Sequence, residues 1–402
     1  MAEIQGHYEP AFEKLVDFFR DKFSKDEEVG AAININVNGK DVVDIWAGYT
    51  GEDKTTPWSS DTIVNVYSST KTIAAIAVLL AQERGLLSVD DSVAKHWPEF
   101  AQNGKEKVLI RHVMSHNSGL SGWQDPITVE QVCDVPYSTA KLAEQAPWWE
   151  PGSGSGYHAT TQGHLLGEIV KRASGIPMKQ FIAEELSKPL KADFQIGAKE
   201  EDWPRIAPVI PPPPRTLDES QLDKNGIMFK SFFNPRTDAN FSRMPAWRNA
   251  DMSAVNGHAT AKGLNRILRA VTLSGTSHDD TKLLSPKTVE EIFRIQSETT
   301  DHCIGIPVRF GIGFALGGGP SAQVFDYLPQ EKMCFWTGWG GSFAICDLHR
   351  GVTFTYVMNK MGSGIIGNDR SIEYARMAWQ ILKQGEATEL RECLTILAYP
   401  AG

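Results

Sequence analysis

Ser68 and Lys71 have the residue types and the spacing for nucleophilic chemistry on an acyl group. The chain reads Ser68-Ser69-Thr70-Lys71 at the start of an apolar stretch that ends at Gly85. A serine hydroxyl is a weak nucleophile unless a neighbouring base takes its proton. Residues at i and i+3 share one face of a helix, so Lys71 can lie beside the Ser68 oxygen. A lysine that is removed from water has a lowered pKa, which suits a base, and the helix N-terminus favours developing negative charge.

A second tetrad of the same form, Ser138-Thr139-Ala140-Lys141, lacks this context. It follows Pro136-Tyr137 and not a short extended run, whereas the nucleophile of such a motif opens a buried helix. We therefore predict that Ser68 is the nucleophile and that Ser138 is the N-cap of the next helix.

His112 and His116 stand four residues apart, a spacing at which two histidines can bind a metal ion. No Glu follows His112, as the corresponding metalloprotease motif requires. We expect neither histidine to be a ligand, and the sequence predicts no metal and no organic cofactor.

The elements that must position Ser68 can be predicted from hydrophobic periodicity and turn residues. Residues 9–24 form an amphipathic pattern, and residues 31–48 alternate around Asn38-Gly39, which predicts a hairpin with a type I′ turn. The sequence predicts further helices, and near the C-terminus two strands joined by a turn at His349–Gly351. The predicted helices lie near 108–116, 138–146, 161–174, 255–275, 285–296 and 371–383. The two predicted strands lie at 334–348 and 351–359.

This order predicts a sheet domain built from both chain ends, 1–75 and 250–402, with a mostly helical lobe inserted at 76–249. Within the lobe, residues 204–249 are rich in proline and aromatic residues without clear periodicity, which is typical of a lid or a binding loop.

Composition and charge exclude several classes of function. The 402 residues have 41% hydrophobic and 22% charged side chains and a net charge of −9, so binding to nucleic acid or to an anionic membrane surface is not expected. No segment has the apolar length of a membrane span or the pattern of a secretory signal. Five cysteines are scattered without metal-type spacing, which predicts reduced thiols and a cytoplasmic protein.

Several segments resemble the β-lactamase-like serine hydrolases, in the right order from about residue 30 to residue 360. Besides the Ser68 tetrad, Tyr157-His158-Ala159 falls on the family's second motif, Y-x-N or S-x-N. Trp336-Thr337-Gly338, just before Gly340-Gly341-Ser342, falls on its third motif, K-T-G or H-x-G. Residues 108–120 (VLIRHVMSHNSGL) and 256–261 (NGHATA) are similar to two further family segments.

The resemblance implies an α+β fold with an antiparallel sheet flanked by helices, a helical lobe, and the site in the cleft between them. It implies that Tyr157 shares the proton with Lys71, which leaves open which of the two is the general base. The backbone N–H groups of Ser68 and Trp339 would form the oxyanion hole. Trp336, Gly338 and His158 would contact the substrate, with Trp336 as a wall of the pocket. For His158, a surface or packed position is the alternative.

The pattern is most similar to the carboxylesterase branch, which includes fungal acyltransferases. Ala159 and Trp336 replace the Asn and the Lys or His that help β-lactamases and penicillin-binding proteins hold a substrate amide and carboxylate. The sequence therefore predicts a serine enzyme that hydrolyses a small ester or thioester. Acyl transfer to a small-molecule alcohol is the alternative, followed by β-lactamase or D-peptidase activity and by a non-catalytic scaffold.

Overall fold

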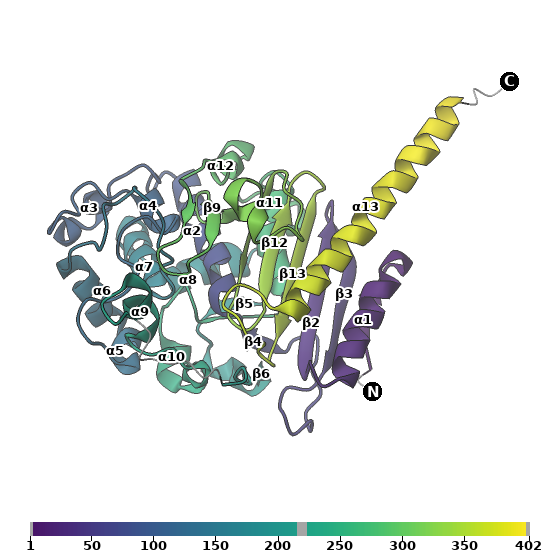
Figure 1. The fold of residues 1–402 in the computed structure, drawn as a ribbon, viewed down its shortest axis with the longest axis horizontal. Coiled ribbons are helices and arrows are strands. Elements are labelled where there is room, and N and C mark those ends of the chain that lie inside the picture. Colours follow the sequence, from purple (N-terminus) through teal and green to yellow (C-terminus); the bar gives the residue numbers. More distant parts are fainter. Residues whose placement is uncertain (1–2, 215–222, 399–402) are drawn as a thin grey trace.

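The protein is described by a computed structural model that covers residues 3–214 and 223–398, with side chains up to residue 385. Its largest element is a nine-stranded antiparallel sheet in the order β1-β3-β2-β13-β12-β11-β10-β9-β8. Strands from the two chain ends, β2 and β13, pair in its middle (Figure 1). The strands are β1 (Gln5–Tyr8), β2 (Gly30–Val37), β3 (Lys40–Gly48), β8 (Ser297–Thr300), β9 (Pro307–Phe310), β10 (Ala315–Leu316), β11 (Met333–Thr337), β12 (Phe343–Asp347) and β13 (Val352–Met358).

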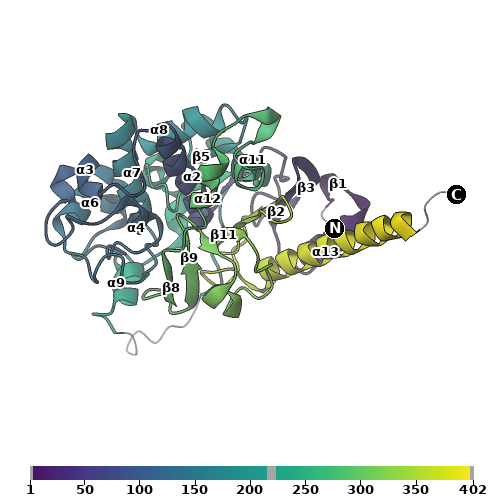
Figure 2. The same cartoon turned by 90° about the horizontal axis from the view of Figure 1, so that it is seen from above.

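Helices cover both faces of this sheet, which confirms the predicted α+β fold. In Figure 1, α1 (Glu13–Ser24) and α13 (Asp369–Ala398) lie on one face, and α2 (Thr70–Glu83) and α11 (Ala261–Thr272) on the other. Figure 2 shows α13 continuing beyond the body of the molecule.

The remaining helices and a small second sheet lie beside the large sheet, on the side of α2 (Figure 1). The small sheet has the order β5-β7-β4-β6, and one continuous cluster of buried hydrophobic side chains extends from the large sheet into the helices. The domain boundaries stay a prediction, because both predicted domains share this core. These elements are β4 (Ile63–Asn65), β5 (Phe194–Ile196), β6 (Ile206–Ala207), β7 (Gly257–Ala259), α3 (Val93–His96), α4 (Ile110–Met114), α5 (Val129–Cys133), α6 (Val135–Glu144), α7 (Thr161–Ser174), α8 (Met178–Ile182), α9 (Ile227–Phe233), α10 (Pro245–Asn249) and α12 (Pro286–Glu291).

Local predictions near the N-terminus are confirmed. The amphipathic segment forms α1 after a short 3₁₀ turn. The hairpin of β2 and β3 turns at Asn38 and Gly39, with φ of 48° and 89° as a type I′ turn requires.

Two predictions are wrong in detail. The strand predicted at 334–348 is two strands, β11 and β12, because Gly340 and Gly341 adopt φ of 92° and 124° and reverse the chain. The segment 204–249 contains the short helices α9 and α10 where no periodicity predicted them, and residues 215–222 of it lie outside the described residues. A lid function for this segment stays a prediction.

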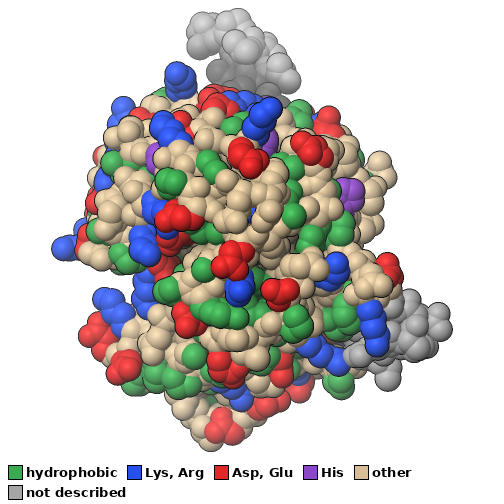
Figure 3. Space-filling model, turned by 90° about the vertical axis from the view of Figure 1, so that its left-hand side faces the viewer, with side chains coloured by type: hydrophobic (Ala, Val, Ile, Leu, Met, Phe, Trp, Pro, Cys, Tyr) green, Lys and Arg blue, Asp and Glu red, His purple; other side chains and the backbone are tan. Residues whose placement is uncertain are grey.

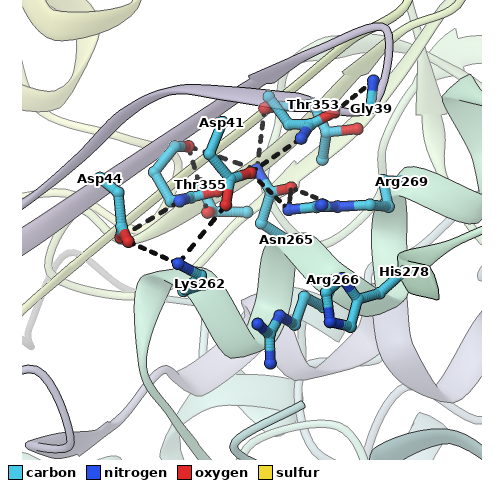
Figure 4. Close-up of polar contacts among 12 residues, drawn as sticks. Gly39, Asp41, Asp44, Lys262, Asn265, Arg266, Arg269, His278, Thr353 and Thr355 are labelled. Carbon is cyan, nitrogen blue, oxygen red and sulfur yellow. Dashed lines mark hydrogen bonds and ion pairs between the residues drawn. The ribbon is translucent and has the colours of Figure 1, made fainter. Parts of the chain in front are cut away.

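A buried polar network attaches α11 to the large sheet (Figure 4). The Asn265 amide donates to the Thr353 carbonyl of β13 at 2.9 Å, and Arg269 donates to Asp41 of β3 at 2.7 Å. Burial acts to raise the pKa of Asp41, but the Arg269 charge and other donors outweigh it and lower that pKa. The network fixes α11 and, with it, the preceding strand β7 that contacts α2.

Acidic and basic side chains are interspersed with hydrophobic ones over the face of the helical part in Figure 3. Neither sign of charge forms a continuous patch on that face. Within the described residues, no helix has the length and the apolar composition needed to cross a membrane.

Candidate active site

Ser68 lies in a tight turn at the entrance to α2. The 3₁₀ turn Tyr67–Ser69 joins β4 to the helix, and Tyr67 adopts a left-handed φ of 45°. Every side chain of α2 from Thr70 to Ala81 is buried, as expected for a helix that is apolar all round. The turn therefore stands on a buried central helix, and Ser68 within it is 9% exposed.

Lys71 Nζ makes three hydrogen bonds inside this site. It lies 3.1 Å from Ser68 Oγ, 2.7 Å from the Ala159 carbonyl and 3.0 Å from the Ala254 carbonyl. Burial lowers the pKa of the Lys71 ammonium well below its usual value. A neutral Lys71 donates its two N–H bonds to the carbonyls, so its lone pair is left to face the Ser68 hydroxyl.

Tyr157 reaches Ser68 from the loop that precedes α7. Its hydroxyl donates to Ser68 Oγ at 2.6 Å, and the Trp336 indole N–H donates to the Tyr157 oxygen at 2.9 Å. Burial raises the pKa of Tyr157. Trp336 thus contacts the Tyr157 hydroxyl directly, and its predicted role as a wall of the pocket stays a prediction.

The predicted oxyanion donors lie at two chain turns. Ser68 N begins the 3₁₀ turn, and Trp339 N lies in the turn between β11 and β12; among the described residues neither N–H has an acceptor. Unpaired N–H groups beside a nucleophile are what an oxyanion hole requires.

The turn between β11 and β12 packs directly against the turn that carries Ser68. Ser342 Oγ donates to the Val66 carbonyl at 2.9 Å and lies 3.1 Å from Ser69 Oγ. A Cβ on Gly338 would stand 2.3 Å from that carbonyl and 2.2 Å from Ser342 Oγ, so only glycine permits this approach. Gly338 is therefore required for the packing of the two turns, and its predicted contact with substrate stays a prediction.

His158 is a packed residue, the alternative to its predicted contact with substrate. It is fully buried, and its ring nitrogens lie 2.6 Å from Ser118 Oγ and 2.6 Å from the Gly156 carbonyl. Burial lowers the pKa of His158 to about 3. Because both nitrogens are used inside the protein, the ring supports the Tyr157 loop and does not face a substrate.

Two residues next to Tyr157 were missed as site residues. Asp301 Oδ1 accepts the Tyr157 N–H at 2.9 Å, and the His116 ring packs against the Tyr157 ring with centroids 4.8 Å apart. His116 lies in a segment that resembles a family motif, which was a usable signal. No sequence signal pointed to Asp301, because Tyr157, to which it is hydrogen-bonded, is 144 positions away.

The second tetrad is placed differently from what the sequence predicted. Asp134 is the N-cap of α6, and Ser138 lies inside the helix with its hydroxyl bonded to the Asp134 carbonyl at 3.0 Å. The helix begins earlier than expected because the Asp134 side chain accepts the Tyr137 N–H.

His112 and His116 do not share a site. The His112 ring accepts the Leu109 N–H at 3.3 Å, whereas His116 faces Tyr157. In the described ranges, no three His, Cys, Asp or Glu side chains are grouped to hold a metal ion.

Comparisons with known proteins agree with this geometry. The family model described as Beta-lactamase matches residues 15–375. Esterase/beta-lactamase LipL of Mycobacterium tuberculosis (strain ATCC 25618 / H37Rv) is 29% identical over 385 residues, which cover 92% of this chain and 86% of LipL.

Two solved structures share the whole fold. A family VIII carboxylesterase has a TM-score of 0.86 at 31% identity, and the match covers 94% of this chain and 100% of that one. A penicillin-binding protein homolog from Caulobacter crescentus has a TM-score of 0.84 at 31% identity, with the same coverage of 94% and 100%. The fold, the serine held between a lysine and a tyrosine, and these relatives lead to one conclusion: the protein is a serine hydrolase that belongs to the Beta-lactamase family.

Proposed function

We propose that this enzyme is a carboxylesterase that hydrolyses small, uncharged esters through an acyl-enzyme on Ser68. The observation that carries the proposal is that Ser68 Oγ lies within hydrogen-bond distance of two proton-transferring groups, Lys71 Nζ at 3.1 Å and Tyr157 OH at 2.6 Å. Such a pair can remove the serine proton and supply one to the leaving group.

The acylation step follows from the donor pattern. Neutral Lys71 takes the Ser68 proton while Oγ attacks the acyl carbon, and the N–H groups of Ser68 and Trp339 bind the oxyanion. The C–O bond to the leaving alcohol breaks, and Tyr157 gives its proton to the alkoxide. The Lys71 ammonium then reprotonates the phenolate, which the Trp336 N–H stabilises meanwhile. Attack by water and the reverse proton transfers release the acid.

The composition of the site favours a neutral acyl group. Trp336 occupies the place of the family's Lys or His and commits its N–H to Tyr157, while Ala159 contributes a carbonyl to Lys71. Neither residue offers the charge or the side-chain amide that would hold a substrate carboxylate or peptide amide. We therefore expect simple carboxylic esters and thioesters to be better substrates than β-lactams.

Acyl transfer to an alcohol is the second candidate, because the nucleophile is shielded. Ser68 is only 9% exposed, and the half-buried Trp339 ring packs edge-on against Tyr67 at 5.3 Å. A site that limits water favours an alcohol at the second step. Adding a primary alcohol to the assay and measuring the ratio of new ester to free acid separates the two candidates.

The test compares Ser68→Ala with Ser138→Ala on p-nitrophenyl acetate and butyrate. Both serines begin an S-x-x-K tetrad and both are buried, so the second variant is a matched control. We expect kcat to fall by about 10⁶-fold in Ser68→Ala, in line with the loss of other serine nucleophiles, and to stay near wild type in Ser138→Ala. Wild-type turnover by Ser68→Ala would rule out the proposal.

A further inference from the structure

Three consecutive backbone N–H groups hold the loop that carries Tyr157, and one residue accepts two of them. Gly156 N donates to the His116 carbonyl at 2.9 Å, and His158 N donates to His116 Nδ1 at 3.1 Å. The N–H between them, that of Tyr157, donates to Asp301 at 2.9 Å. His116 thus fastens the loop on both sides of Tyr157.

The His116 ring also sets the position of the Tyr157 ring. Their centroids are 4.8 Å apart at an interplanar angle of 61°. The centroid of the His116 ring also lies 4.9 Å from that of Phe310 and 6.2 Å from that of Trp336. Such edge-on contacts between rings favour one relative orientation. His116 therefore lies among the rings that surround the Tyr157 phenol.

His116 can accept the His158 N–H only in one ionisation state and one tautomer. An imidazole that accepts at Nδ1 carries its proton on Nε2 and is neutral. Burial lowers the pKa of His116 well below its usual value, with smaller contributions from His158 and Lys71, so the neutral form is the one present at neutral pH.

The His116 backbone has a conformation that residues with a Cβ rarely adopt. Its φ is 64°, in the left-handed region, where Asn, Asp and His are tolerated better than other residues. This conformation allows the carbonyl and the ring of one residue to serve neighbouring N–H groups of the same loop. Strain of this kind is typical of functional sites.

We propose that His116 is a positioning residue that fixes the Tyr157 hydroxyl against Ser68 Oγ, an inference that rests on the proposed esterase function. The 2.6 Å contact between the two hydroxyls depends on where the Tyr157 loop is held. A displacement of about 1 Å at a reacting group lowers a rate by roughly 100-fold.

Three substitutions separate the hydrogen bond from the backbone conformation. In His116→Asn the amide oxygen stands in for Nδ1, and asparagine tolerates the left-handed φ; in His116→Gln the amide oxygen stands in for Nε2. His116→Gly relieves the strain but removes the acceptor.

We expect kcat for p-nitrophenyl butyrate within about 5-fold of wild type for Asn, and roughly 30-fold lower for Gln and Gly. Near-UV circular dichroism and melting temperature establish that each variant is folded. Equal rates for Asn, Gln and Gly would overturn the proposal.

A double-mutant cycle tests whether the effect passes through the Tyr157 hydroxyl. We expect His116→Gly to slow the enzyme roughly 30-fold in the wild-type background but by less than about 3-fold when Tyr157 is already Phe. The same 30-fold loss in both backgrounds would mean a general structural role and would overturn the proposal. If Ser68→Ala were fully active, the esterase function itself would fail. If Ser68→Ala is inactive and His116→Gly turns over substrate at the wild-type rate, only the role of His116 is refuted.

Discussion

Ser68 Oγ lies between two groups whose pKa values burial shifts in opposite directions. Burial lowers the pKa of the Lys71 ammonium well below its ordinary value and raises the pKa of the Tyr157 phenol, so it favours the neutral form of both groups. A neutral amine accepts a proton and a neutral phenol donates one. At the residue scale, these shifts favour Lys71 as the base and Tyr157 as the acid in the proposed acylation step.

This assignment predicts the direction of the pH dependence. In the proposed step Lys71 must be neutral to take the Ser68 proton, so kcat/KM should rise with pH through the pKa of Lys71 and level off above it. Because burial lowers that pKa, the rise should be complete far below the ordinary lysine range near 10.5. A profile of kcat/KM for p-nitrophenyl butyrate from pH 4 to 9 checks this, and activity that increases as pH falls would contradict it.

Trp336→Phe removes the N–H that donates to Tyr157 and keeps an aromatic ring in place. A hydrogen bond to a group that becomes charged contributes about 1.5–3 kcal/mol, so we expect kcat/KM to fall by roughly 10- to 100-fold. Trp97→Phe is the control, because Trp97 is equally buried at 3% but packs against Phe100 in the helical part. If kcat/KM falls by the same small factor in both variants, the Trp336 N–H does not take part in the mechanism.

At the scale of elements, the site depends on how closely two turns approach. The turn after β11 brings Trp339 N, and the turn before α2 brings Ser68 N. Ser342 bridges them through the Val66 carbonyl, and Gly338 lets the backbones meet. The proposed oxyanion hole therefore depends on the contact between the two turns.

Gly338→Ala should separate these turns. The added Cβ would overlap the Val66 carbonyl and Ser342 Oγ, so we expect a loss of about 1–3 kcal/mol in stability and a larger loss in kcat than in substrate binding. Gly167→Ala in α7 is the control, since the nearest atom there is 3.9 Å away. Steady-state kinetics and thermal melting check both variants, and wild-type kcat in Gly338→Ala would contradict this account.

At the scale of the whole molecule, a buried charge cluster joins the two chain ends outside the active site. Glu28 precedes β2 and lies 3.2 Å from Arg370 Nε of α13, and it also accepts hydrogen bonds from Tyr356 and Tyr374. Burial raises the pKa of Glu28, and the Arg370 charge opposes that rise. The cluster therefore contributes to the attachment of α13 to the sheet, beside the buried rings of Tyr374 and Trp379.

Arg370→Met should leave a buried carboxylate without its counter-charge and lower the free energy of unfolding by about 3–5 kcal/mol. The pKa of Glu28 would then rise further above its unfolded value, so the variant should be more stable at pH 5 than at pH 8. Urea unfolding at the two pH values measures this. A variant as stable as wild type at both would show that the pair does not hold α13.

The sequence predicted parts of the fold and site from local spacing, and Tyr157, Trp336 and Trp339 from the resemblance to the family. Ser68 and Lys71 are three residues apart, and the Asn38-Gly39 turn joins adjacent strands. The Trp336 hydrogen bond and the two bonds to His116 were not predictable, because they join residues 179 and about 40 positions apart. No local pattern encodes such contacts, and they depend on the packing of the complete sheet and helices.

Intact-mass measurement after incubation with p-nitrophenyl butyrate and acid quenching tests the central claim most directly. The account predicts one butyryl adduct on the wild type, located by peptide mapping to Ser68, and its absence from Ser68→Ala. Steady release of p-nitrophenol with a transient adduct indicates hydrolysis, and an adduct that persists in water until an alcohol is added indicates transfer. An adduct on another residue, or turnover by Ser68→Ala, would contradict the account.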